Sequence, residues 1–127
     1  MAAEHLISIV DDDSAMRDAL VSLVRSLGYN ARGFASGEEF LACDDLERFS
    51  CAITDIQMPG MSGFELKQLL DERHGRLQVI MITARFEPGL KEKAVSSGVS
   101  CFLRKPLESE TLVACLEKAL SAASPTP

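Results

Sequence analysis

Short apolar runs alternate with segments of helical spacing along the chain. The runs are rich in Ile and Val and do not alternate with polar residues, a pattern typical of strands buried on both faces. Each run is short enough to be a single strand. We therefore predict five strands, at residues 6–10, 29–34, 51–55, 79–83 and 99–103.

Each predicted strand is followed by a predicted helix. The first helix begins at Ser14 and ends at Gly28, because glycine favours the position just past a helix end. Two more begin with a serine followed three residues later by a glutamate, the pattern of a capping box. These pairs are Ser36 with Glu39 and Ser62 with Glu65.

The last two helices are predicted from their apolar positions. The fourth helix follows Pro88, with Leu90, Ala94 and Val95 as apolar positions. The fifth helix has an apolar stripe from Leu112 to Leu120.

This alternation of five strands and five helices predicts an α/β fold. Right-handed crossovers between parallel strands place helices on both faces of the sheet. A chain of 127 residues has the usual length of one domain. We assign residues 1–121 to that domain and residues 122–127, which are rich in Ser and Pro, to a C-terminal tail or the start of a linker.

Charge and composition disfavour several classes of protein. The chain has 19 acidic and 13 basic residues, a formal net charge of −6, so direct binding to nucleic acid is unfavourable. No apolar run approaches the roughly 20 residues of a membrane-spanning helix, and the first ten residues lack the basic start of a signal peptide. We expect a soluble, cytoplasmic protein. The four cysteines show no CxxC spacing and are predicted to pack in the core rather than bind zinc.

Polar residues follow the predicted strands at the points where these end. Asp11 and Asp12 follow the first strand, Asp55 ends the third, Thr83 ends the fourth and Lys105 follows the fifth. The carboxyl ends of parallel strands share one edge of a sheet, and ligands bind there where the strand order reverses. If the first and third strands are neighbours, the three aspartates converge at that edge.

Three converging carboxylates need a cation or must take up protons, and a divalent ion is the natural remedy. Two unit charges ~4 Å apart repel by about 4 kcal/mol at an effective dielectric near 20. Mg2+ suits such a site because it prefers hard oxygen ligands and keeps positions for water or phosphate. A metal beside a carboxylate, a hydroxyl and an ammonium group is what phosphoryl transfer requires. Asp55 is then the attacking group, with Lys105 and Thr83 binding phosphoryl oxygens.

Four motifs in the chain carry a family resemblance. They are residues 9–13 (IVDDD), 54–63 (TDIQMPGMSG), 82–84 (ITA) and 102–106 (FLRKP). Over essentially its whole length the chain resembles the receiver domains of two-component response regulators, of the CheY-like type. Residues 28–29 and 34–41 are further similar to receivers of the FixJ type of transcription regulators.

The resemblance implies a (βα)5 flavodoxin-like fold with strand order 2-1-3-4-5, and a role for each pocket residue. It implies that Asp55 is the phosphoacceptor, Asp12 a direct Mg2+ ligand and Asp11 a helper through water. The main-chain carbonyl of Gln57 is implied as the remaining protein ligand. The protein would accept phosphate from a histidine kinase, and it would be no enzyme beyond catalysing its own phosphorylation and dephosphorylation.

The resemblance also implies a switch. Thr83 would move towards the phosphate while Phe102 turns inward, and the Lys105-Pro106 bond would be cis. The face formed by the fourth helix, fifth strand and fifth helix would bind a second copy, a partner or a DNA-binding output domain. Asp13 stands where many relatives have Glu, and we expect it to face solvent or a neighbouring base rather than the metal.

Two other functions compete with this one. Some related domains act as phosphate-independent interaction modules, but their acidic pockets are eroded, whereas every expected residue is present here. A flavin mononucleotide carrier of the same topology needs a phosphate-binding loop after the first strand, and residues 11–13 would repel that phosphate.

Overall fold

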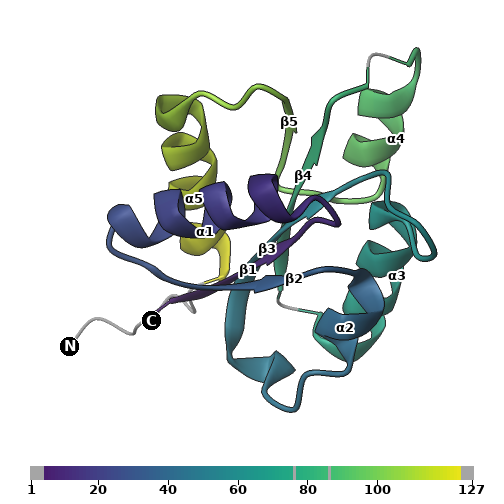
Figure 1. The fold of residues 1–127 in the computed structure, drawn as a ribbon. Coiled ribbons are helices and arrows are strands. Elements are labelled where there is room, and N and C mark those ends of the chain that lie inside the picture. Colours follow the sequence, from purple (N-terminus) through teal and green to yellow (C-terminus); the bar gives the residue numbers. More distant parts are fainter. Residues whose placement is uncertain (1–4, 76, 86, 124–127) are drawn as a thin grey trace.

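Strands and helices alternate along the chain (Figure 1). The computed structural model describes residues 5–75, 77–85 and 87–123. All five predicted strands and all five predicted helices are present. The strands are β1 (Leu6–Val10), β2 (Asn30–Phe34), β3 (Phe49–Asp55), β4 (Gln78–Thr83) and β5 (Cys101–Arg104). The helices are α1 (Ser14–Ser26), α2 (Gly37–Leu41), α3 (Gly63–Arg73), α4 (Leu90–Ser96) and α5 (Ser109–Ala123), with a short 3-10 helix, η1, at Leu46–Arg48.

The five strands form one parallel sheet in the order β2-β1-β3-β4-β5, which confirms the predicted topology. Strands β1 and β3 are neighbours, and Val10 lies opposite Thr54 in their register. The residues that follow Val10 therefore lie beside Asp55 at the carboxyl edge of the sheet. This adjacency places the candidate site.

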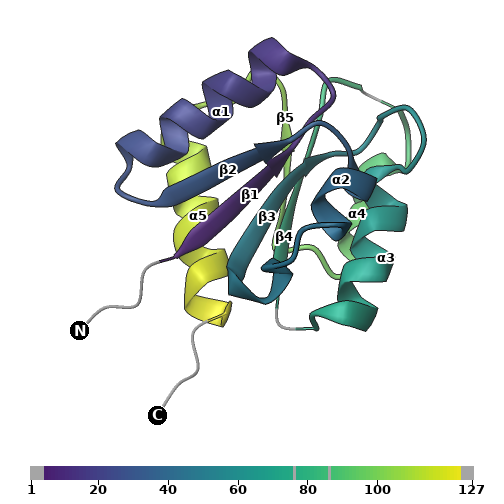
Figure 2. The same ribbon diagram turned by 60° about the horizontal axis from the view of Figure 1, so that its bottom comes forward.

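Helices cover both faces of the sheet. Helices α1 and α5 pack on one face, and α2, α3 and α4 lie on the other (Figure 2). Alternate residues of each strand point to opposite sides, so Ile80 joins the core under α1 and α5, whereas Met81 joins the core on the other face. This explains why the strands read as continuous apolar runs.

Some details of the elements differ from the prediction, and the other strand bounds agree to within one residue. Strand β3 begins at Phe49, two residues earlier than predicted, because the Phe49 ring is buried against the rings of Phe34 and Phe40. Strand β5 begins at Cys101 rather than residue 99. Val95, predicted to face the core from α4, is 60% exposed.

Helix ends agree closely with the predicted caps. The Ser62–Glu65 capping box is present, with both of its hydrogen bonds. Ser36 Oγ accepts from the Glu39 amide, but the Glu39 carboxylate accepts from the amide of Ala35 rather than that of Ser36. Helix α5 continues to Ala123, past the proposed domain boundary at residue 121. Residues 124–127 of the predicted tail lie outside the described residues.

Candidate functional site

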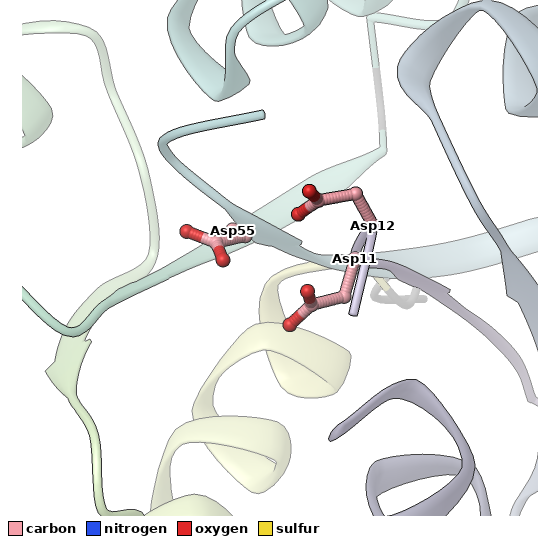
Figure 3. A group of neighbouring side chains, drawn as sticks. All are labelled: Asp11, Asp12 and Asp55. Carbon is pink, nitrogen blue, oxygen red and sulfur yellow. The ribbon is translucent and has the colours of Figure 1, made fainter. Parts of the chain in front are cut away.

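Three aspartates meet at the carboxyl edge of the sheet. Asp11 and Asp12 follow β1, and Asp55 ends β3; one carboxylate oxygen from each lies within 4.8 Å of the others (Figure 3). Asp11 is fully buried, Asp55 is nearly so, and Asp12 is exposed. The convergence predicted from the strand ends is therefore present.

Lys105 lies between two of these aspartates. Its Nζ is 3.1 Å from Asp11 Oδ2 and 3.0 Å from Asp55 Oδ2. Burial opposes the charged form of Lys105, but hydrogen bonds and charges from Asp55 and Asp11 outweigh it and raise the pKa of this ammonium group. The main chain holds the residue in place, because the Lys105 amide donates to the Thr83 carbonyl at 2.8 Å. The Lys105-Pro106 peptide bond is cis, as the resemblance implied.

The main chain around the pocket also fixes the carboxylates. Asp55 Oδ1 accepts from the Gln57 amide at 3.1 Å, and Asp11 Oδ1 accepts from the Asp13 amide at 3.0 Å. Each of these two carboxylates thus has one oxygen on a backbone N–H and the other on Lys105. The Gln57 peptide lies beside Asp55, and its carbonyl as a metal ligand stays a prediction.

Asp13 has a structural task of its own. It is the N-cap of α1, and its Oδ1 accepts from the amides of Ala15 at 3.0 Å and Met16 at 3.3 Å. The expectation that it faces away from the metal agrees with this geometry. Its capping role was not predicted, because Ser14, the next residue, is an equally good cap type.

Thr83 and Phe102 lie on neighbouring strands. Thr83 is buried at the end of β4, next to the residue that pairs with Asp55, and its Oγ1 accepts from the Arg85 amide at 3.0 Å. Phe102 is half-buried on β5. In this structure the Thr83 hydroxyl therefore already has a main-chain partner within the loop that follows β4.

Gly63, at the start of α3, allows this helix to approach β3 closely. Its amide donates to the Ile56 carbonyl at 2.8 Å. A Cβ atom built on Gly63 would lie 2.6 Å from the Asp55 carbonyl oxygen and 2.9 Å from Ile56 Cα. Any other residue would therefore displace the backbone that carries Asp55. In the sequence, Gly63 stands out only as the last residue of the motif at residues 54–63.

The donor set fits a hard divalent cation. All three side chains offer carboxylate oxygens, which Mg2+ prefers, and no sulfur or nitrogen ligand is among them. The exposed Asp12 carboxylate gives the group an opening to solvent, which an ion that retains water requires. Asp12 and Asp55 are the residues that would hold Mg2+ directly.

Comparison with known proteins identifies the family. Residues 7–117 match the response regulator receiver domain. The chain belongs to this family, the receiver domains of two-component signal transduction, in which aspartyl phosphorylation and Mg2+ binding are general features. The match includes Asp11, Asp12, Asp55 and Lys105, the residues of the acidic pocket.

Individual relatives support the narrower placement. The chain is 32% identical to the transcriptional regulatory protein FixJ of Bradyrhizobium diazoefficiens over 125 residues, which cover 98% of this chain and 61% of FixJ. It is 36% identical to the response regulator protein TmoT of Ectopseudomonas mendocina over 122 residues, 94% of this chain and 54% of TmoT. The chain thus spans little more than half the length of these relatives.

A solved structure agrees with the fold. Vibrio cholerae chemotaxis protein CheY4 superposes with a TM-score of 0.84 at 29% identity, and the match covers 93% of this chain and all of CheY4.

Within residues 5–75, 77–85 and 87–123, no helix is both long enough and apolar enough to cross a bilayer.

Proposed function

We propose that Asp55 accepts a phosphoryl group from a phosphohistidine of a histidine kinase, and that Mg2+ bound by Asp12 and Asp55 is required for the transfer. The observation that carries this proposal is the contact of Lys105 with both Asp11 and Asp55 inside a cluster of three carboxylates. In this arrangement the Lys105 ammonium group contacts the Asp55 carboxylate, to which phosphorus would bind. Main-chain amides orient the same carboxylates.

Each residue of the pocket has its own role in the proposed phosphoryl transfer. A carboxylate is ionised at neutral pH, so Asp55 needs no general base to attack phosphorus. The new O–P bond forms as the P–N bond of phosphohistidine breaks, and the electron pair stays on the imidazole nitrogen. Mg2+, when bound, neutralises charge on the phosphoryl oxygens. Lys105 then exchanges its contact with Asp55 Oδ2 for a phosphoryl oxygen, while Asp11 keeps its other partner, the Asp13 amide.

Phosphorylation would act through Thr83 and Phe102. The Thr83 hydroxyl accepts from the Arg85 amide here, and a phosphoryl oxygen on Asp55 would be a new acceptor for its proton. Movement of Thr83 towards that acceptor would vacate the space for Phe102 to turn inward. The α4-β5-α5 face would change shape and bind a second copy or an output partner in the cytoplasm. FixJ is named a transcriptional regulatory protein, which supports a DNA-binding output.

The direct test is mass spectrometry after incubation with Mg2+ and a small acyl phosphate. The wild-type protein should gain one phosphoryl group, and Asp55→Asn should gain none. Asp44→Asn is the matched control, because this aspartate lies in the segment before η1, away from the acidic pocket. Uptake by Asp55→Asn equal to that of the wild type would refute the assignment, as would equal uptake without any divalent ion.

A further inference from the structure

A continuous set of contacts connects Thr83 to Phe102. Thr83 Oγ1 accepts from the Arg85 amide at 3.0 Å, and the Arg85 carbonyl accepts from Arg104 Nη1 at 3.3 Å. The Arg104 guanidinium carbon lies 5.7 Å from the centre of the Phe102 ring, over its face. Arg104 is also the residue directly opposite Thr83 in the register of β4 and β5. One side chain thus contacts both the loop that holds Thr83 and the ring of Phe102.

We propose that Arg104 is a positioning residue that couples Thr83 to Phe102 and stabilises their unphosphorylated arrangement. This inference rests on the proposed function, because it concerns the switch that phosphorylation of Asp55 would drive. It adds a residue that the strand-end pattern did not indicate.

Arginine is suited to both contacts at once. The guanidinium group is planar, so N–H groups at its edge can donate to a carbonyl while its face lies on an aromatic ring. A lysine ammonium group is a compact charge without such a plane. The side chain of Arg85 takes no part, because its Nη1 pairs with Glu87 Oε1 at 2.9 Å. Arg85 therefore contributes only its main chain to the path from Thr83.

The contacts of Arg104 oppose the switch. When the Thr83 hydroxyl turns to a phosphoryl oxygen, the Arg85 amide loses its acceptor, and the Arg85 main chain is released to move. Arg104 then loses its carbonyl partner, and the face of Phe102 is no longer covered. A ligand shifts a two-state equilibrium only by its differential affinity for the two states. Removing Arg104 should therefore lower the cost of the switch and strengthen binding of a phosphoryl mimic.

The test uses Arg104→Gln and Arg104→Lys in the full chain. Binding of beryllium fluoride with Mg2+ is measured by amide NMR titration, after thermal unfolding has shown that each variant folds. A solvent-exposed cation–π contact is weak, so Arg104→Gln should bind the mimic about two- to fivefold more tightly than wild type. Arg104→Lys keeps the charge but loses the plane, and it should change in the same direction.

The matched control is Lys91→Gln. Lys91 is an exposed cation that lines the same surface hollow as Phe102 and Arg104. Its loss should leave the affinity unchanged. An equal gain in Lys91→Gln would show a general charge effect and overturn the proposal, and so would wild-type affinity in Arg104→Lys.

A second measurement separates coupling from a general effect on stability. Without the mimic, the Thr83 and Phe102 signals of Arg104→Gln should move along the line between their free and mimic-bound positions in the wild type. Signals that stay in place would overturn the proposal. If the wild-type protein itself fails to bind the mimic, the phosphorylation site is wrong; if it binds and Arg104→Gln equals it, only the role of Arg104 is wrong.

Discussion

The three consecutive aspartates after β1 have different environments and different contacts. Asp11 is buried and contacts Lys105, Asp12 is exposed beside the pocket, and Asp13 caps α1. The sequence predicted that Asp11 and Asp12 converge with Asp55, because the carboxyl ends of neighbouring parallel strands share one edge of the sheet. It did not predict the contact of Asp11 with Lys105. The capping role of Asp13 was not predicted either, since both Asp13 and Ser14 are good cap types and the backbone angles decide which of them caps the helix.

Cys51 offers a prediction at the scale of a single residue. Burial, reinforced by the neighbouring Cys101 and Cys115, raises the pKa of the Cys51 thiol from its ordinary value of 9.0 to about 12. The unfolded chain therefore loses this proton near pH 9, whereas the folded protein keeps it. The stabilisation is fully present below pH 9 and is lost as the pH rises towards 12.

Between pH 9 and 12 this thiol should lower the free energy of unfolding by about 1.4 kcal/mol per pH unit. The decrease is measured as the difference in free energy of unfolding between wild type and Cys51→Ala, from urea denaturation at several values of pH. Groups that do not interact with Cys51 affect both proteins equally, so the difference reports Cys51 together with its coupling to Cys101 and Cys115. A difference independent of pH between 9 and 11 would contradict the prediction.

At the scale of elements, the sequence was most informative where a local signal is strong. The Ser62–Glu65 capping box places the start of α3, and Gly98, at φ +88°, follows the end of α4. It was least informative where tertiary packing decides. Phe49 belongs to β3 because its ring completes an aromatic cluster, and a polar residue, Ser50, interrupts the apolar pattern between Phe49 and Cys51.

The contact of α3 with β3 depends on Gly63. Gly63→Ala should destabilise the protein by about 1–3 kcal/mol, because the new methyl group would overlap the Asp55 carbonyl and the Ile56 backbone. It should also slow phosphoryl uptake, since Asp55 would be displaced. Urea denaturation and the mass assay measure the two effects.

Gly75→Ala is the control for this substitution. Among the described residues, a Cβ at Gly75 meets the Asp71 carbonyl alone, at an ordinary distance of 3.5 Å. This variant should retain the stability of the wild type within about 0.5 kcal/mol. Equal losses in the two variants would show that the close approach at Gly63 is unimportant.

At the scale of the whole molecule, the topology and the pocket were both predictable, for the same reason. Alternating strands and helices require a parallel sheet, and a parallel sheet collects the ends of its strands at one edge. The contacts of Arg104 were not predictable, because they depend on the direction of one exposed side chain and on the path of the loop after β4. Pattern alone carries no information on such directions.

Metal binding should stabilise the whole fold. A ligand that binds only the folded state adds about 2.7 kcal/mol at 100 times its dissociation constant. Mg2+ should therefore raise the melting temperature of the wild type in a concentration-dependent way. The rise should be much smaller in Asp12→Asn, which removes one charged ligand but retains an oxygen.

The control for this experiment is Asp71→Asn, since Asp71 pairs with Lys67 on α3 and is not one of the three clustered aspartates. This variant should respond to Mg2+ as the wild type does. If Asp12→Asn gained as much stability from Mg2+ as the wild type, the ion would bind elsewhere.

The direction of α5 has a practical consequence. The helix begins just after Lys105 and runs back along the sheet for 15 residues, about 22 Å, so its last turn lies at the opposite edge from Asp55 (Figure 2). A fluorescent reporter joined there would leave the mouth of the acidic pocket unobstructed for a bulky phosphodonor. The reactive carboxylate would therefore stay accessible to the kinase in such a fusion.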